Sequence, residues 1–191
     1  MVEVLIVNIS TASYDLDSLF SKLDPARQKK AKAYVKEEDR IRSIIGSTLI
    51  ERFAKPGRLS YNEQGKPYGE NGFFNLSHSG DIVALALCEE EVGIDVEKMD
   101  PKRAEGLSRY IFKEDLTLNQ FYARWTRIEA VGKCLGIGAA EFRKLPFTEG
   151  EVSFDGADLF TMTQEKDGYM YSLAVRSFIK PEVTVRHLHS L

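Results

Sequence analysis

The chain has 191 residues, 43% of them hydrophobic and 29% charged, which suits one globular domain or two small lobes sharing a core. Its net charge of −3 gives no reason to expect nucleic-acid binding, and no apolar run approaches membrane-spanning length. The first residues lack the regions of a signal peptide, and two cysteines without zinc or redox spacing suit a reducing compartment, so we expect a cytoplasmic protein.

The N-terminal part begins with strand and helix patterns. Residues 2–9 predict a strand, and Asp24 followed by Pro25 predicts a capped helix that reaches about Val35. A second helix is predicted from about Glu37 to before Pro56-Gly57. Its apolar face consists of Ile41, Ile44, Ile45 and Leu49.

Three segments follow up to the middle of the chain. Residues 62–72 read as a turn-rich loop, and residues 73–80 lead through a turn into a buried strand at 82–87. The next strand, 92–97, comes after an acidic turn, so we expect these last two strands to form a hairpin.

The C-terminal half is predicted to hold one long helix and then strands. Residues 100–115 read as a loop or short helix. The buried stripe of the long helix is Leu118, Phe121, Trp125 and Ile128. From Phe142 onward we expect strands, with turns at Asp155-Gly156 and Asp167-Gly168.

The two halves resemble each other at a nearly constant offset. Four segments match at offsets of 86 to 89 residues: 45–49 with 131–135, 74–77 with 160–163, 85–87 with 173–175, and 94–96 with 183–185. This predicts a helix-then-strands unit used twice. The second copy has Thr184 and Arg186 where the first has Asp95 and Glu97, so one site between two lobes is expected.

Asp95 and Glu97 are the acidic pair of the strand at residues 92–97. Because residues two apart point to the same face of a strand, both carboxylates project together while Ile94 and Val96 point to the other face. Paired carboxylates repel unless a cation lies between them, and oxygen ligands suit Mg²⁺. The ordinary alternative is a solvated acidic strand edge.

Glu129 and Lys133 lie one turn apart on the long helix. Such a pair could be an exposed contact that contributes only tenths of a kcal/mol, on the order of other surface helix pairs. Together with Asp95 and Glu97, however, it supplies what phosphate chemistry requires. A metal neutralises phosphate oxygens, and basic side chains stabilise the charge that develops.

Five motifs resemble those of the 4′-phosphopantetheinyl transferases. G-I-D-V-E at residues 93–97 and W-T-R-I-E-A-V-G-K at residues 125–133 are similar to the signature pair of that family. N-L-S-H-S at 75–79, G-K-P at 65–67 and E-D-R-I-R at 38–42 are similar to upstream elements of its single-chain, two-lobed branch, which activates surfactin synthetase. The motifs occur in the order found in the family.

The resemblance implies an architecture that agrees with the internal repeat. We expect an α+β fold of two similar α/β lobes related by a pseudo-twofold duplication, each a small antiparallel sheet packed with a long helix. Residues 1–98 would form the N-terminal lobe with the phosphate-binding residues and the acidic pair. Residues 99–191 would form the C-terminal lobe with the Trp-Glu-Lys helix, and the active site would lie between the lobes.

The resemblance also implies an activity: Mg²⁺-dependent transfer of the phosphopantetheine arm of coenzyme A to a serine of an apo acyl or peptidyl carrier protein, with release of 3′,5′-ADP. Mn²⁺ could replace Mg²⁺. The expected partners are coenzyme A and the carrier protein, without nucleic acid or membrane, and the protein is expected to be monomeric.

Site residues follow from the same resemblance. Asp95, Glu97 and Glu129 would surround the metal, Glu129 would act as the base for the carrier serine, and Lys133 would contact the phosphate that is attacked. Asp95, Glu129 and Lys133 would thus form the catalytic set. The residues implied to bind coenzyme A are Lys29, Arg42, Lys66, Ser77, His78 and Lys133.

Ile128 departs from the family pattern. Members usually have lysine at this position, before the glutamate that corresponds to Glu129, whereas Ile128 fits the apolar stripe of the helix. The departure favours an alternative, a catalytically impaired relative that binds coenzyme A or a carrier protein. A metal-dependent phosphohydrolase is a third reading. His78 could also be an ordinary turn histidine, and Trp125 a core residue.

Overall fold

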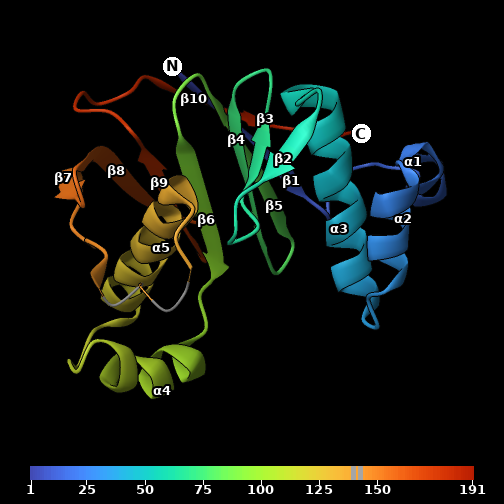
Figure 1. The fold of residues 1–191 in the computed structure, drawn as a ribbon. Coiled ribbons are helices and arrows are strands. Elements are labelled where there is room, and N and C mark those ends of the chain that lie inside the picture. Colours follow the sequence, from blue (N-terminus) through green and yellow to red (C-terminus); the bar gives the residue numbers. More distant parts are fainter. Residues whose placement is uncertain (139–140, 142–143) are drawn as a thin grey trace.

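The structure is a computed structural model that describes residues 1–138, 141 and 144–191. Within these residues, two four-stranded sheets and one two-stranded ribbon are joined by helices, which confirms the expected α+β class (Figure 1). The first sheet has the spatial order β10 (Val183–His187), β1 (Val2–Asn8), β5 (Ile82–Cys88), β4 (Phe73–Ser79). The second has the order β6 (Val92–Lys98), β9 (Tyr169–Val175), β8 (Ala157–Lys166), β7 (Gly150–Phe154).

The helices begin where side chains cap them. They are α1 (Leu16–Lys22), α2 (Pro25–Lys32), α3 (Glu37–Leu49), α4 (Pro101–Ile111) and α5 (Leu118–Leu135), with a π-helical turn η1 (Ile50–Ala54) extending α3. As predicted, Asp24 caps α2 by accepting a hydrogen bond from the Arg27 N–H. Thr117 and Gln120 form a reciprocal capping box at the start of α5. None of the helices in the described part of the chain is both long and apolar enough to cross a membrane.

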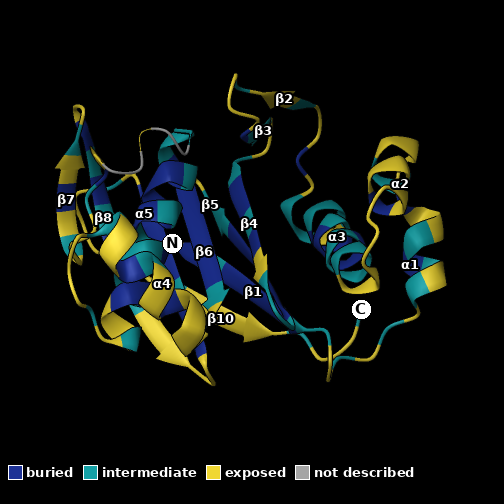
Figure 2. Cartoon of the chain, turned by 90° about the horizontal axis from the view of Figure 1, so that it is seen from below, coloured by how far each residue is buried: buried dark blue, intermediate teal, exposed yellow. Residues whose placement is uncertain are grey.

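Apolar side chains pack between the two sheets and between each sheet and its long helix. Alternate residues of β1 face opposite ways: Leu5 and Val7 pack under α3, while Val4 and Ile6 pack against the second sheet. A further cluster lies between α5 and the second sheet. Figure 2 shows the buried residues concentrated in the central strands. The two sheets therefore share one core, with α3 and α5 on opposite outer sides.

The two sheets repeat one topology, as the internal repeat predicts. In the first, β1-β5-β4 is antiparallel and α3 precedes β4; in the second, β6-β9-β8 is antiparallel and α5 precedes β8. The topological counterpart of β6 is therefore β1, and not residues 183–185 as the sequence match suggested. Strand β10 instead crosses back to pair with β1 in parallel.

The predicted hairpin of β5 with β6 is wrong. Strand β5 pairs with β1 and β4, whereas β6 pairs with β9, with Val92 opposite Val175. Apolar periodicity shows which residues are buried but does not identify the neighbouring strand. As a result, the acidic pair belongs to the second sheet, whose other three strands all follow residue 98.

Smaller differences concern the loops. The stretch around residues 62–72 contains the ribbon of β2 (Leu59–Tyr61) and β3 (Pro67–Gly69), residues 73–79 are the strand β4, and residues 101–111 form α4. The expected C-terminal strands are present, with left-handed residues at both predicted turns. Phe142, named as the start of that region, lies outside the described residues.

Candidate active site

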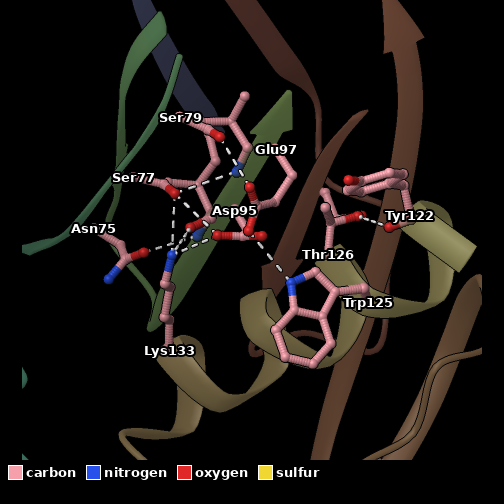
Figure 3. Close-up of polar contacts among 12 residues, drawn as sticks. Asn75, Ser77, Ser79, Asp95, Glu97, Tyr122, Trp125, Thr126 and Lys133 are labelled. Atoms are coloured by element: carbon pink, nitrogen blue, oxygen red, sulfur yellow. Dashed lines mark hydrogen bonds and ion pairs between the residues drawn. The ribbon is translucent and has the colours of Figure 1, made fainter. Parts of the chain in front are cut away.

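Strands β4 and β6 are edge strands of their sheets. Side chains of β4, and not its backbone, form the hydrogen bonds to the backbone of β6. Three side-chain oxygens, two residues apart on β4, accept backbone N–H groups of β6: Asn75 Oδ1 from Ile94 at 2.9 Å, Ser77 Oγ from Val96 at 3.2 Å and Ser79 Oγ from Lys98 at 3.0 Å. We call this contact the β4–β6 seam. It joins the two sheets at the place where the predicted site residues Ser77, Asp95, Glu97 and Lys133 lie together (Figure 3).

Asp95 lies in the seam and is bound by Lys133. The Asp95 side chain is 7% exposed, and its Oδ1 accepts from Lys133 Nζ at 2.6 Å and from Ser77 Oγ at 3.0 Å. Lys133 Nζ also donates to Ser77 Oγ at 3.1 Å and to the Ile94 carbonyl at 3.3 Å. Burial raises the pKa of Asp95, and the Lys133 ammonium opposes that rise. Three elements, β4, β6 and α5, thus meet at one ammonium group.

The second oxygen of Asp95 differs from the first in its surroundings. Asp95 Oδ2 is buried and makes no hydrogen bond to any residue that the structure describes. An unpaired buried carboxylate oxygen costs free energy, so a bound cation or water at this position would stabilise it. The atom is consequently the strongest indication in this region that the seam accommodates a further group.

Glu97 projects from the same face of β6 and has a full set of donors. Its Oε2 accepts from Ser79 Oγ at 2.8 Å and from Arg103 Nη1 at 3.2 Å. Its Oε1 accepts from Arg103 Nη2 at 3.3 Å and from Trp125 Nε1 at 3.4 Å. The two carboxylates, equivalent in the sequence pattern, therefore differ in how far their oxygens are already occupied.

Glu129 lies one turn before Lys133 on α5 and is half-buried. Burial, followed by the charge of Asp95 and to a smaller extent that of Glu97, raises the pKa of Glu129, and Lys133 and Arg103 oppose the rise; the resulting pKa is about 7. These influences place Glu129 in the electrostatic field of both strand carboxylates. A carboxyl group with this pKa exchanges a proton near neutral pH.

Gly93 allows α5 to approach β6 so closely. A Cβ atom at Gly93 would lie 2.0 Å from the Ala130 carbonyl oxygen and 2.4 Å from the Cys134 nitrogen. Only a residue without a side chain fits between the strand and the helix backbone. This contact brings Lys133 within reach of Asp95, two residues along the strand.

Arg42 and His78 lie on the α3 side of β4. Arg42 Nη1 donates to the Gly80 carbonyl at 2.6 Å and Nη2 to Asp39 Oδ1 at 2.7 Å, which ties α3 to the turn after β4. Desolvation lowers the pKa of His78, and the charges of Arg42 and Lys133 lower it further. His78 is on an exposed strand position and not in a turn. Positive charges on both sides of β4, Arg42 and Lys133, therefore act on the imidazole.

Lys29 and Lys66 are placed apart from the seam. Lys29 is exposed on α2, and α3 lies between α2 and β4 in both overall views (Figures 1 and 2). Lys66 is 7% exposed; its Nζ donates to the Cys134 carbonyl at the end of α5 and lies 3.8 Å from Glu91 Oε1. The contacts of Lys66 fix the β2–β3 ribbon to α5.

Sequence reasoning missed the hydrogen-bonding roles of four residues. Asn75 and Ser79 flank Ser77 at a spacing of two, which is a usable signal, because all three must share one strand face. The indole of Trp125 stacks on Phe121, with ring centroids 6.5 Å apart, while its N–H reaches Glu97. Arg103 carries no signal in the sequence, because α4 brings it to Glu97 from outside every motif.

A divalent cation fits the chemistry of this donor set but is not prearranged. Among the described residues, no group of three or more His, Cys, Asp and Glu side chains is positioned to hold a metal ion. Carboxylate oxygens are nevertheless the ligands that Mg²⁺ prefers, and Asp95 Oδ2 is unpartnered. Binding at Glu97 would require Arg103 to leave, because it already contacts both carboxylate oxygens.

A hollow of about 580 Å³ lies on the opposite face of β6. Val4, Ile94 and Leu173 contribute to its lining between the two sheets. Because Ile94 and Asp95 are adjacent on the strand, they point to opposite faces. Strand β6 therefore separates this hollow from the Asp95–Lys133 pair.

Comparison with known proteins gives one consistent result. A profile of the 4′-phosphopantetheinyl transferase superfamily matches residues 91–183, which include β6 and α5. The 4′-phosphopantetheinyl transferase gsp of Aneurinibacillus migulanus is 30% identical over 159 residues, which cover 72% of this chain and 67% of that protein. The 4′-phosphopantetheinyl transferase Sfp of Bacillus subtilis strain 168 is 26% identical over 167 residues, 74% of this chain and 75% of Sfp.

A third relative matches over a shorter stretch. The 4′-phosphopantetheinyl transferase AcpT of Salmonella typhi is 36% identical over 110 residues, 49% of this chain and 57% of AcpT. The chain thus spans little more than half the length of AcpT but about three quarters of Sfp.

Proposed function

The chain belongs to the 4′-phosphopantetheinyl transferase superfamily, and we propose that it transfers the phosphopantetheine arm of coenzyme A to a serine of an apo acyl or peptidyl carrier protein, releasing 3′,5′-ADP. The observation that carries this proposal is the meeting of β4, β6 and α5 at the Lys133 ammonium, between Ser77 and Asp95. The cytoplasmic location and monomeric state stay predictions from the sequence.

Positive charge near the seam supports binding of an anionic substrate. Lys133 and Arg42 both act on His78, so a cationic field extends across β4. Coenzyme A carries several phosphate groups, which charge-assisted hydrogen bonds bind well. We propose that Arg42, Ser77, His78 and Lys133 bind these phosphates. Lys29 and Lys66 would join them only by leaving the positions described above.

The proposed metal ligands are Asp95, through its unpartnered Oδ2, with Glu97 and Glu129. Together these carboxylates would hold Mg²⁺, which supplies neutralising charge to the phosphate oxygens of the phosphoanhydride bond that is broken. Lys133 would exchange Asp95 for a phosphate oxygen of coenzyme A. Ser77 would keep its hydrogen bond to the β6 backbone and so preserve the seam.

The proposed base is Glu129. A serine hydroxyl is a weak nucleophile and requires an adjacent proton acceptor. The pKa of about 7 allows Glu129 to accept that proton near neutral pH, although a bound cation would lower this pKa. Oxygen of the carrier serine would then attack phosphorus, and 3′,5′-ADP would leave.

Ile128, the feature that favoured a non-catalytic binding module, has another explanation. Ile128 is 4% exposed and packs in the core between α5 and the second sheet, so its apolar character has a structural reason. A module that only binds coenzyme A has no need of Glu129 beside two further carboxylates. We therefore favour the enzyme.

Transfer is tested directly by mass spectrometry. Purified protein, coenzyme A, Mg²⁺ and a panel of apo carrier proteins are expected to yield carrier with one added phosphopantetheine. Glu129→Gln and Lys133→Ala should each reduce the initial rate by at least about 100-fold, the range of lost acid–base and charge-stabilising groups.

The matched control is Glu105→Gln on the exposed face of α4, which should leave the rate unchanged. Calorimetry with coenzyme A separates the two candidates. Binding without an adduct on any carrier would support the binding module, and neither binding nor adduct would contradict both.

A further inference from the structure

Glu97 is held by a cation that neither the motifs nor the family resemblance assigned. Arg103, in the first turn of α4, contacts both carboxylate oxygens of Glu97, at 3.2 and 3.3 Å. Lys133 contacts one oxygen of Asp95, and the other has no partner within the described part of the chain. The strand carboxylates thus each have a resident cation, but only Asp95 keeps an open oxygen.

A divalent ion can reach Glu97 only if one of its donors leaves. Ser79 Oγ is fixed, because it also accepts from the Lys98 N–H of the seam. Trp125 is fixed by stacking on Phe121. The Arg103 side chain is 45% exposed, against 16% for Glu97, and its two hydrogen bonds are long. Arg103 is therefore the donor that can be displaced.

The position of Arg103 is fixed at the backbone. Asp100 caps α4, and its backbone N–H donates to the Tyr122 hydroxyl of α5 at 3.0 Å. The first turn of α4 is thus tied to the same helix that carries Glu129 and Lys133. This attachment keeps the guanidinium near Glu97 even when the side chain swings away.

We propose that Arg103 is a resident counter-cation that competes with the divalent ion for Glu97 and so weakens metal binding until it is displaced. The guanidinium occupies the oxygens the ion needs and repels the ion electrostatically. This inference rests on the proposed function, because it concerns the same metal. It makes α4 a regulatory element: any contact that draws Arg103 toward solvent strengthens metal binding at Glu97.

Trp125 provides a readout that does not depend on catalysis. It is the one tryptophan in the sequence, and its indole N–H donates to Glu97 Oε1. When an ion takes Glu97 from Arg103, the environment of this indole changes. Tryptophan emission during a Mg²⁺ titration at constant ionic strength, without coenzyme A or carrier, therefore follows occupation of Glu97.

We expect Arg103→Gln to lower the Mg²⁺ concentration at half-saturation by about two- to fivefold, the range of a partly exposed ion pair. Arg103→Lys keeps the charge, so its Mg²⁺ concentration at half-saturation should lie between those of the wild type and Arg103→Gln. In a Glu97→Gln background, replacing Arg103 should change nothing. Lys102→Gln removes the neighbouring exposed charge of α4 and should match the wild type.

The proposed competition is overturned if Arg103→Gln has the same Mg²⁺ concentration at half-saturation as the wild type, or a higher one. It is also overturned if Lys102→Gln lowers that concentration as much as Arg103→Gln does. An indole emission that stays constant at saturating Mg²⁺ in a wild-type protein that modifies its carrier overturns it too. These results leave the proposed function intact. If no variant responds to Mg²⁺ and no carrier is modified with Mg²⁺ present, both proposals are overturned together.

Discussion

Glu129 carries a carboxyl group whose charge changes near neutral pH. Its pKa in the folded protein is about 7, above the ordinary value of 4.5. The folded state therefore binds this proton more tightly than the unfolded state does. The resulting contribution to stability is fully present below about pH 4.5 and is lost as the pH rises through about 7.

Replacing Glu129 with glutamine should reveal this loss. Without divalent ions at pH 8, Glu129→Gln is expected to raise the free energy of unfolding by about 1–3 kcal/mol, because a buried charge is removed. At pH 4 the two proteins should differ little, since the carboxyl group is then neutral. Urea denaturation at both pH values measures the difference, and an equal gain at both would contradict the shifted pKa.

At the scale of single residues, the sequence identified the candidate site residues but not the side chains that contact them. Asp95, Glu97, Glu129 and Lys133 stand out because acidic and basic side chains at strand and helix spacing suit phosphate chemistry. The difference between an open Asp95 and a fully bonded Glu97 depends on Arg103, which arrives from a different helix. No spacing rule reports such a contact.

Contact between β6 and α5 is the element-scale feature on which the site depends. Gly93 lies where the strand and helix backbones touch, and a Cβ atom there would overlap the Ala130 carbonyl. Close packing at this point sets the distance from Lys133 to Asp95. The helix must move outward if Gly93 gains a side chain.

Gly93→Ala is therefore expected to destabilise the protein by at least about 3 kcal/mol, the upper range for overpacking against backbone. The matched control is Gly106→Ala in α4, where a Cβ atom would have no described residue within 4 Å apart from its own stretch of helix. This substitution should stabilise the protein by about 1 kcal/mol. Thermal denaturation measures both changes. A Gly93→Ala protein as stable as the wild type would contradict the tight contact.

Elements were easier to predict than their pairing. Helices α2 and α5 follow from a cap and an apolar stripe, and β5 from a continuous apolar run. Strands β5 and β6 are nevertheless not partners, because the turn after β5 carries the chain into the second sheet. Local patterns describe the faces of a strand, whereas pairing depends on how the two sheets share their core.

At the scale of the whole molecule, two copies of one topology meet at a single seam. The counterpart of β6 in the first copy is β1, whose residues Leu5 and Val7 pack in the core instead of carrying carboxylates. Only β6 thus brings an acidic pair to the contact between sheets. The repeated topology supplies the scaffold, and the difference between the two sheets places the acidic pair.

The central claim is that Asp95 Oδ2 accepts a divalent ion while Lys133 turns from Asp95 to a phosphate of coenzyme A. Crystals grown with coenzyme A and Mn²⁺, measured at the manganese absorption edge, test it most directly. The account predicts an anomalous peak in contact with Asp95 Oδ2 and Glu129, with Lys133 Nζ bound to phosphate. Coenzyme A bound elsewhere, or bound with no manganese at Asp95 and Lys133 still paired to it, would contradict the account.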